Sequence, residues 1–213
     1  YENAGQIAYE IKKLDNAVKV VGKMCRNCFA PILNFTIEYT FYDDAVDVEL
    51  NYAVADYVSY LPRIGLKFAL PGRMEDKFIY KGYGPHESYI DKHIGDEYGE
   101  YESTAQKEYF RYVRPQESGS HCGSTEVEFD AMKITAEKPF SFSVLPYSAE
   151  MLALSAHDFE LPETDSVYVS LDVAMSGVGT NSCGPELAQK YRAPKKGRNK
   201  FRIVFKHIVF KHI

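Results

Sequence analysis

The 213-residue chain has no tryptophan, only four cysteines and no run of 18 apolar residues. A transmembrane helix needs about 20 mainly apolar residues, so no membrane-spanning helix is expected. The cysteines are too few for a secreted scaffold that depends on disulfides, which favours a reducing, cytoplasmic location. The chain begins at Tyr1, without a basic and apolar leader, and we interpret it as part of a longer polypeptide.

Positive charge is also scarce. The chain carries 25 Lys and Arg against 30 Asp and Glu, a formal net charge of −5. Its one basic cluster, residues 190–202, contains Pro and Gly, and we interpret it as a surface loop followed by a strand. Phosphate backbones require clustered basic side chains, so we expect no nucleic-acid partner.

Signatures of metal or redox chemistry are missing. The six histidines form no H-E-x-x-H pattern, and the C-x-x-C pair Cys25 and Cys28 has no second pair. We therefore expect no bound metal and no cofactor. We expect Cys25 and Cys28 to be two thiols packed beside a strand. His86 follows a Gly-Pro turn and His157 a helix end, where we expect imidazoles satisfied by backbone groups.

Nucleophilic catalysis also lacks a signature, because no G-x-S-x-G elbow occurs. His121 and Cys122 stand next to each other, and adjacent residues of a strand point to opposite faces, which disfavours a thiol nucleophile. A retaining glycosidase needs two carboxylates about 5 to 5.5 Å apart, and sequence spacing pairs no two acids of this chain.

Alternating apolar residues predict antiparallel strands through much of the chain. Residues 35–52 predict a hairpin with an acidic turn at Asp43 and Asp44. The same period returns around residues 66–70, 140–144, 167–173 and 201–205. The sequence therefore predicts an all-β fold.

One short helix is predicted from Ser148 to His157, with Ser148 as its cap and Met151, Leu152 and Leu154 facing the core. Between Gly82 and Gly123 the alternation is lost, over a length unusual for a loop inside a compact domain. Such a segment must be ordered by short strands of its own or by a neighbouring domain.

The chain ends in a five-residue repeat, VFKHI, which fits neither strand nor helix periodicity. We interpret residues 209–213 as an addition from cloning, and residues 1–208 as one domain.

Five motifs occur in an order that resembles the C-terminal domain of the large β-galactosidases of glycoside hydrolase family 2. They are LPRIGLKF (61–68), YKGYGPHESYIDKHIGDEYGEY (80–101), RYVRPQESGSHCGSTEVEF (111–129), YSAEMLALSAHDFEL (147–161) and LDVAMSGVGTNSCGPE (171–186). The resemblance covers Ala17 to Ile208. The Trp-Arg-Ala-Pro segment that the family carries near the front of this domain is not found, which implies that the front of the domain is truncated.

The resemblance implies an antiparallel supersandwich like that of galactose mutarotases, placed over a barrel that holds both catalytic glutamates of a retaining β-galactosidase. Neither glutamate motif is in this chain, so we expect no catalytic residue here and no activity from the chain alone. His86 and Glu87 then belong to a shaped connection that braces the domain and its neighbours. The implied partners are the barrel, the other domains and a β-galactoside; the parent could also form a homo-oligomer.

The loop GTNSCGPE provides the candidate substrate-binding residues. In some relatives the resembling loop places an aromatic ring in the sugar pocket, and this chain has Cys183 there, so stacking by that residue is lost. Asn181 and Ser182 can still form hydrogen bonds with a sugar hydroxyl.

Two other functions remain open. A free-standing carbohydrate-binding module would need an exposed aromatic platform, for which Tyr83, Tyr89, Tyr98 and Tyr101 are candidates. A mutarotase-like epimerase would need a His and a Glu that converge on one cavity, and the sequence cannot place such a pair.

Overall fold

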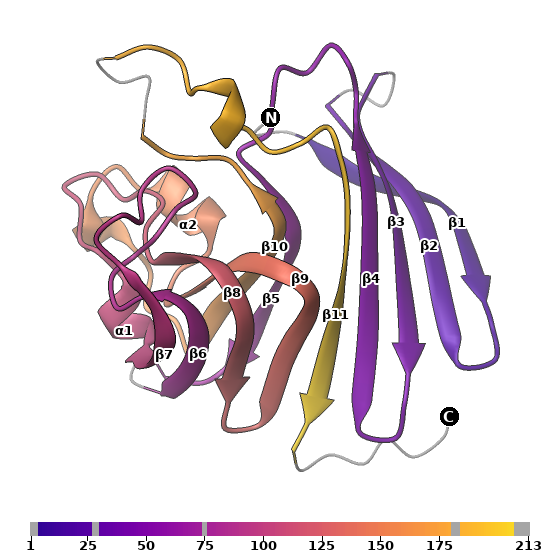
Figure 1. Cartoon of the computed structure of the whole chain (residues 1–213), viewed down its shortest axis with the longest axis horizontal. Helices are drawn as coiled ribbons and strands as arrows, with labels where there is room; N and C mark the ends of the chain where they lie inside the picture. Colours follow the sequence, from indigo (N-terminus) through magenta and orange to yellow (C-terminus); the bar gives the residue numbers. More distant parts are fainter. Residues whose placement is uncertain (1–3, 27–29, 74–75, 180–183, 207–213) are drawn as a thin grey trace.

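The computed structural model describes residues 4–26, 30–73, 76–179 and 184–206 of the chain. Over these residues the protein is almost entirely antiparallel β-sheet (Figure 1). The strands are β1 (Gly5–Lys13), β2 (Ala17–Cys25), β3 (Pro31–Phe41), β4 (Ala45–Val54), β5 (Arg63–Pro71), β6 (Lys77–Gly84), β7 (Glu97–Thr104), β8 (Ser120–Phe129), β9 (Met132–Leu145), β10 (Ser166–Met175) and β11 (Lys196–Phe205). The predicted all-β class is confirmed.

The predicted hairpin is β3 and β4. Ile37 pairs with Leu50 and Tyr39 with Val48, so the apolar residues of the two strands share faces as the alternation requires. The turn closes where Tyr42 N–H donates to the carbonyl of Ala45, at 2.8 Å, around the two predicted aspartates.

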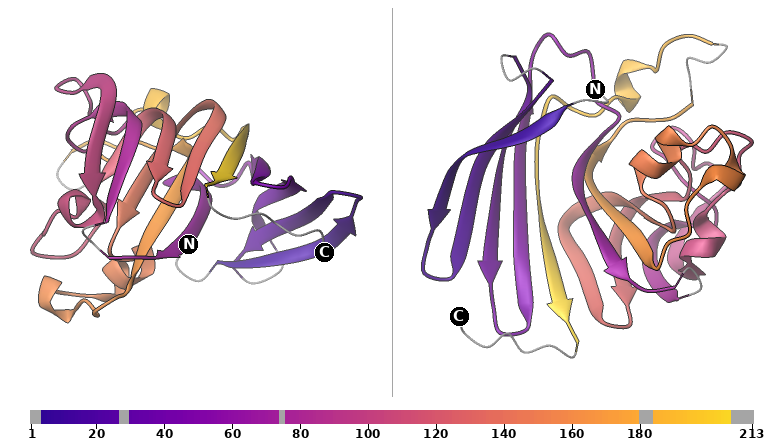
Figure 2. Two further views of the ribbon diagram at one scale, coloured as in Figure 1. Left: turned by 90° about the horizontal axis from the view of Figure 1, so that it is seen from below. Right: turned by 180° about the vertical axis from the view of Figure 1, so that it is seen from behind.

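The long strand β9 divides the sheet. Strand order is β1-β2-β3-β4-β11-β9-β8-β6-β7, and β5 lies off this path, paired with β10. Residues 132–136 of β9 pair with β11, whereas residues 141–145 pair with β10. Figure 2 shows the result: β1 to β4 form one wing, β6 to β9 form the other, and β5 and β10 lie on the side that faces the viewer in the view from behind.

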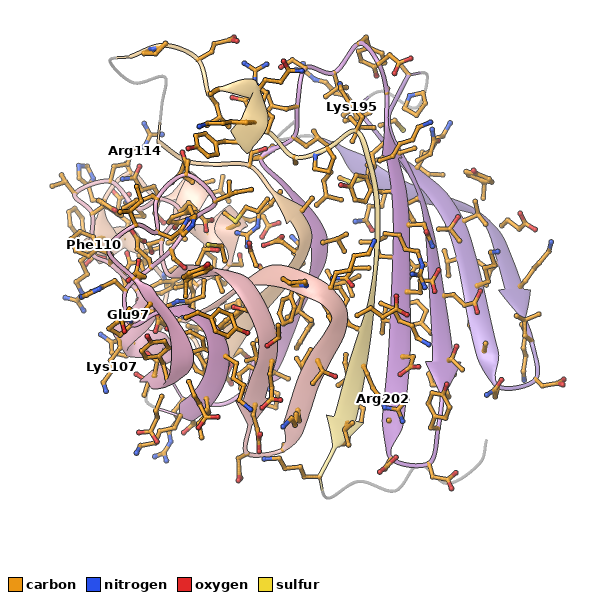
Figure 3. The ribbon with its side chains drawn as sticks, in the orientation of Figure 1. Glu97, Lys107, Phe110, Arg114, Lys195 and Arg202 are labelled. Atoms are coloured by element: carbon orange, nitrogen blue, oxygen red, sulfur yellow. The ribbon has the colours of Figure 1, made fainter. Side chains whose placement is uncertain are left out.

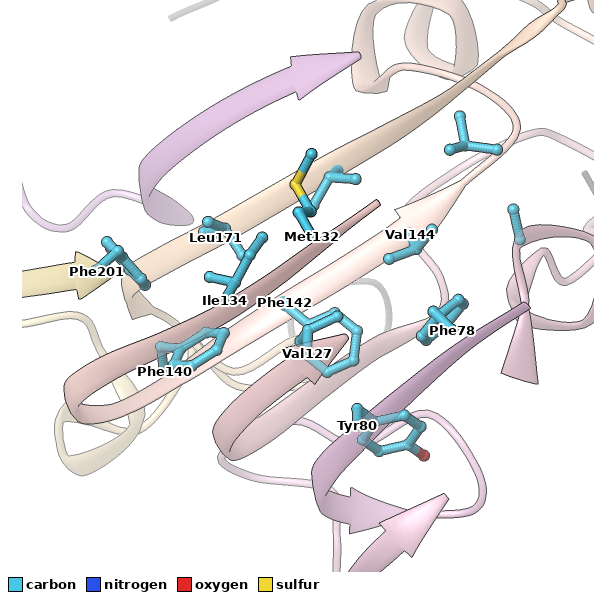
Figure 4. Close-up of a cluster of buried hydrophobic side chains, with 13 residues drawn as sticks. Phe78, Tyr80, Val127, Met132, Ile134, Phe140, Phe142, Val144, Leu171 and Phe201 are labelled. Carbon is cyan, nitrogen blue, oxygen red and sulfur yellow. The ribbon is translucent and has the colours of Figure 1, made fainter. Parts of the chain in front are cut away.

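The two largest apolar clusters of the described residues form most of the core. The larger gathers side chains from β6, β8, β9, β10 and β11, including Phe78, Phe142 and Phe201 (Figure 4). The smaller packs β3 and β4 against β5, through residues such as Leu50 and Ile64. Because β5 covers the inner face of the β3–β4 hairpin, the apolar side chains that alternate along β3 and β4 are buried in one layer.

The predicted helix is α2 (Ala149–Leu154), with the Ser148 hydroxyl accepting from Met151 N–H at 3.2 Å. Leu152 is buried, but Leu154 is 87% exposed, so the prediction that it faces the core is wrong. The helix ends at Leu154, where no further turn brings that side chain back onto the core. Three short helical turns that the sequence did not predict are α1 (Ala105–Glu108), η1 (Asp158–Glu160) and η2 (Gln189–Tyr191).

The segment from Gly82 to Gly123 is ordered by elements of this chain. Strand β7 pairs with β6 along its whole length, and α1 follows directly, capped by Thr104. Of the two sources of order considered for this segment, the chain's own short strands are therefore present. The basic cluster begins in η2, which the sequence did not predict, and continues into β11, the strand that the sequence did predict there.

Candidate functional site

The candidate residues Asn181, Ser182 and Cys183 lie outside the described part of the chain, but the stem of their loop is well defined. Ser176, buried at the end of β10, donates through its hydroxyl to Leu61 O at 2.7 Å and accepts from Ala193 N–H at 2.9 Å. Gly177 N–H donates to Tyr191 O at 2.9 Å. Both arms of the loop are thus attached to each other and to the start of β5.

The run GYGPHESYIDK packs beside this stem. Asp91 accepts two backbone hydrogen bonds from it, Val178 N–H to Oδ1 at 3.1 Å and Gly179 N–H to Oδ2 at 2.8 Å. A tight turn holds Asp91 in place, because Tyr89 and Lys92 exchange two backbone hydrogen bonds of 2.9 Å. The run and the candidate loop, far apart in sequence, therefore meet.

Glu87 serves structure in this run. One oxygen accepts from Gly119 N–H at 3.0 Å and from the Tyr89 hydroxyl at 3.3 Å, and the other pairs with Lys92 at 2.7 Å. His86 is exposed, and its Nδ1 lies 3.3 Å from Asp96 Oδ1. The two neighbours thus have separate partners, as expected for a shaped connection, although the partner of His86 is a carboxylate and not the expected backbone group.

A charged network that the sequence did not reveal lies behind the stem. Arg63 forms a two-point contact with Asp172, at 3.1 and 2.6 Å, and a third bond of 2.9 Å with Glu117. Asp172 is 3% exposed, whereas 31% of the Glu117 side chain remains accessible. Because the guanidinium charge is already balanced by Asp172, burial raises the pKa of Glu117 above its ordinary value. Its Oε1 is buried without a hydrogen-bond partner.

A cavity of about 300 Å³ opens beside this network, lined also by Lys67, Tyr147, Tyr168 and Glu150. Lys67 pairs with Glu150 and lowers the pKa of that carboxyl. Each acid on this cavity is therefore paired with a cation. The described residues of the chain contain no group of His, Cys, Asp and Glu side chains arranged to hold a metal ion.

The remaining candidates are a buried imidazole and a buried thiol. His121 is fully buried, with Nε2 at 2.9 Å from Glu108 Oε2 and Nδ1 at 3.2 Å from Tyr83 O. Cys122 is also buried, and burial raises the pKa of its thiol. Both imidazole nitrogens have other partners, so the two side chains do not form a nucleophile and base. This agrees with the sequence prediction that adjacent residues of a strand point to opposite faces.

The amino-acid sequence matches the family model described as "Beta galactosidase small chain" over residues 2–205. The chain belongs to this family. A β-galactosidase of Actinobacillus pleuropneumoniae is 38% identical over 218 residues, covering 100% of this chain and 21% of that protein. A β-galactosidase of Staphylococcus xylosus is 40% identical over 137 residues, covering 62% and 14%. The chain thus spans about a fifth, or less, of these relatives' length.

Among solved structures, a galactose mutarotase-like protein from Lactobacillus casei aligns with 92% of this chain and 72% of that chain. The TM-score is 0.43 and the sequence identity is 10%.

An epimerase needs a His and a Glu that meet in an open cavity, and the described residues of this chain do not place such a pair in the cavity beside Arg63. His121 and Glu108 do converge, but their side chains are 0% and 7% exposed, and neither lines the cavity beside Arg63. His157 lies on the surface, where its Nδ1 is 3.1 Å from Glu160 Oε1, a carboxylate partner that the sequence did not predict.

The four tyrosines proposed as a sugar-binding platform do not form one. Tyr89 is 2% exposed, and the Tyr83 ring meets the Tyr98 ring edge to face at a centroid distance of 5.7 Å. The Tyr101 ring packs on buried Tyr80, at 5.5 Å. A stacking platform needs free ring faces side by side, so this interpretation is wrong for these residues.

Within the described residues, no helix has both the length and the apolar character that crossing a bilayer requires. The cysteines described, Cys25 and Cys122, are free thiols in buried positions.

Proposed function

We propose that the chain is the C-terminal, non-catalytic part of a retaining β-galactosidase of glycoside hydrolase family 2, which hydrolyses terminal β-D-galactosides. The observation that carries the proposal is similarity to a β-galactosidase over the whole of this chain but only 21% of that enzyme. A cytoplasmic location for the parent agrees with the buried free thiols of Cys25 and Cys122.

Asn181, Ser182 and Cys183 are the residues proposed to reach the sugar. An amide and a hydroxyl supply donors and acceptors for sugar hydroxyls, while a small thiol leaves the pocket wall open. Support comes from the stem of this loop, where Ser176 and Gly177 are attached to the fold from two sides. A fixed stem is what a loop needs in order to present side chains reproducibly to a substrate.

The second proposed role is contact with the other domains of the parent. Exposed apolar side chains gather on the outer part of the β6–β9 wing, where Figure 3 labels Phe110. Phe110 and Val113 lie on the loop after α1 and are 60% and 90% exposed, and Phe159 lies in η1 and is 83% exposed. Tyr109 joins the two segments, because its hydroxyl donates to Asp158 Oδ1 at 2.7 Å. Apolar groups exposed together on one side of a domain favour an interdomain surface.

The chain alone is proposed to be inactive. Retaining hydrolysis requires a nucleophilic carboxylate and an acid/base carboxylate on the two sides of the bond. Glu117 and Glu150 line the cavity beside the network, but each already forms an ion pair, Glu117 with Arg63 and Glu150 with Lys67. Neither is free to act as a nucleophile.

A domain exchange tests this function. The matched region of the Actinobacillus enzyme is replaced by this chain, and hydrolysis of an activated aryl β-galactoside is measured. We expect the chimera to be active, and both the enzyme lacking that region and the 213-residue chain alone to be inactive. A folded but inactive chimera would contradict the domain assignment, and turnover by the purified chain alone would contradict its proposed inactivity.

A further inference from the structure

The cavity beside the Arg63 network lies on the face of the sheet that points away from the larger apolar core. Along β10, Val169 and Leu171 belong to that core. Since successive side chains of a strand point to opposite faces, Tyr168 and Ser170 lie on the other face, and both residues line the cavity. The floor of the cavity is therefore formed by the polar face of β10.

The floor extends over three strands. Ser143 of β9 and Lys67 of β5 both pair with Ser170, one on each side, so these three residues form a row across the sheet. Tyr147 and the helix α2 complete the wall. The enclosed volume of about 300 Å³ lies at the lower end of the range for small-molecule sites, which matches a ligand of one ring.

The hydroxyl groups of this cavity are largely unused by the protein. Those of Tyr147, Tyr168 and Ser170 have no hydrogen-bond partner among the described residues. Ser143 Oγ only accepts a long bond of 3.4 Å from Arg63, so its own hydrogen is also free to donate. Because each hydroxyl can donate one hydrogen bond and accept others, the cavity offers several donors and acceptors to a bound molecule.

The charged side chains at the cavity are already paired with one another. Arg63 binds Asp172 and Glu117, and Lys67 binds Glu150. An anionic ligand would meet three carboxylates, and a cationic ligand would have to compete with Arg63 and Lys67 for the same acids. Oε1 of Glu117 is buried without a hydrogen-bond partner, which an uncharged donor could supply. These groups favour a neutral ligand that is rich in hydroxyl groups.

We propose that this cavity binds a neutral, cyclic polyhydroxyl compound of the size of one monosaccharide, with hydroxyl groups of the ligand on Ser143, Tyr168 and Ser170. The rings of Tyr147 and Tyr168 add apolar surface against which the C–H groups of such a ring can pack. The proposal uses no residue of the loop that carries Asn181, Ser182 and Cys183, and it does not depend on the proposed function.

Nuclear magnetic resonance titration of the 213-residue chain tests the proposal, with D-galactose and myo-inositol as probes. We expect saturable shifts of the backbone amides of Ser143, Tyr168 and Ser170 with at least one probe, and a Kd in the millimolar range that a ligand of about 12 heavy atoms allows. Neither polyol causing such shifts would overturn the proposal.

Three compounds of the same ring size test the chemical class of the ligand. Cyclohexanol carries one hydroxyl and should bind at least about tenfold more weakly than the better polyol, because most of the hydrogen bonds are missing. Cyclohexylammonium and cyclohexanecarboxylate add a charge and should bind as weakly. If any of the three binds as tightly as the polyols, the cavity does not select hydroxyl groups and the proposal is wrong.

Three variants test the residues. Ser170→Ala and Tyr168→Phe each remove one hydroxyl, and each should raise Kd about two- to tenfold. Ala69→Phe should abolish binding, because Ala69 pairs with Tyr168 on the floor and the new ring would fill the cavity. Ala69 is exposed, so the larger side chain does not enter the core. Tyr9→Phe, which changes an exposed tyrosine of β1 outside the cavity, is the matched control and should leave Kd unchanged.

The amide spectrum of each variant shows whether it is folded and where the probe binds. An unchanged Kd in folded Ala69→Phe would place the probe elsewhere and overturn the proposal. Shifts confined to Ser176 and Gly177 would overturn it too, and would instead support sugar binding at the candidate loop. An inactive chimera in the domain exchange, by contrast, would contradict the proposed function and leave this site supported by its own titration.

Discussion

The β3–β4 hairpin and the segment from Gly82 to Gly123 reach an ordered structure in different ways. In the hairpin, successive residue pairs across the two strands repeat the same arrangement. The side chains of Leu33, Phe35, Leu50 and Tyr52 are buried in one layer. No single contact is decisive, because each residue adds a similar increment of buried apolar surface.

The segment from Gly82 to Gly123 depends instead on individual polar contacts. Ser88 accepts Cys122 N–H at 3.0 Å and donates to Tyr83 O at 3.2 Å, while Glu87 joins the same region to Gly119. These bonds tie the irregular start of the segment to its return into β8. Removing one leaves a buried donor or acceptor without a partner, which costs more than the bond itself contributes.

The difference suggests two kinds of response to substitution. Loss of an apolar side chain from the hairpin weakens the whole fold, because the buried layer is shared by many residues. Loss of one acceptor in the segment should release the backbone locally, because the bonds of the neighbouring groups remain intact.

The largest effect is expected for Leu50→Ala. Leu50 is 4% exposed, and such truncations cost about 2 to 5 kcal/mol through lost burial and the remaining cavity. Denaturant unfolding followed by circular dichroism measures the change. Asn51→Ala, on the opposite face of the same strand, is the control and should cost about 0.5 kcal/mol or less. Similar losses for both variants would show that the hairpin is not stabilised by its buried face.

A smaller and local effect is expected for Glu87→Gln. The amide keeps the size of the side chain but has only one acceptor oxygen, so its NH2 group must face either the Lys92 ammonium or Gly119 N–H, and one of these two contacts is lost, at a cost of about 1 to 3 kcal/mol. Amide exchange at Gly119 and across residues 82–96 should accelerate, while β10 remains protected. Glu97→Gln, an exposed change on β7, is the control.

This second experiment can also break the comparison. If Glu87→Gln lowers the denaturant midpoint as much as Leu50→Ala does and leaves local exchange unchanged, the two regions unfold as one unit.

The same contrast explains what could be predicted from the sequence. Alternation located β3, β4, β5, β9, β10 and β11, because each buries one face and leaves the other polar. Strand β7 escaped prediction since its aromatic residues, Tyr98 and Tyr101, are three positions apart and so face opposite sides of the strand. It is identified only by its pairing with β6.

The candidate site was less predictable. Arg63 meets Glu117 and Asp172 across 54 and 109 residues, and nothing in the spacing of the sequence joins them. Asp172, an acid within the apolar strand β10, was the available signal of a buried partner. The pair Gly177 and Gly179 was a second signal, since closely spaced glycines often mark a close approach by another group.

The smallest expected effect concerns the charged side chains beside the cavity. It tests whether a buried charged network can lower the stability of the folded state, in contrast to buried apolar side chains, which raise it. Burial raises the pKa of Glu117 above the value near 4.5 of an unfolded chain. Its ionisation therefore costs stability as pH rises from that value through the folded-state pKa, about 1.4 kcal/mol per pKa unit of difference. Glu117→Gln should gain stability relative to the wild type over this range and lose that gain below pH 4.5.

Glu150→Gln is the control of opposite sign: Lys67 lowers the pKa of Glu150, so its carboxylate stabilises the fold at neutral pH and that contribution disappears as pH falls. Thermal unfolding of the three proteins between about pH 4 and 8 measures both trends. A difference between Glu117→Gln and the wild type that stays constant with pH would show that Glu117 titrates normally, and that the Arg63 network supports the fold as the apolar layers do.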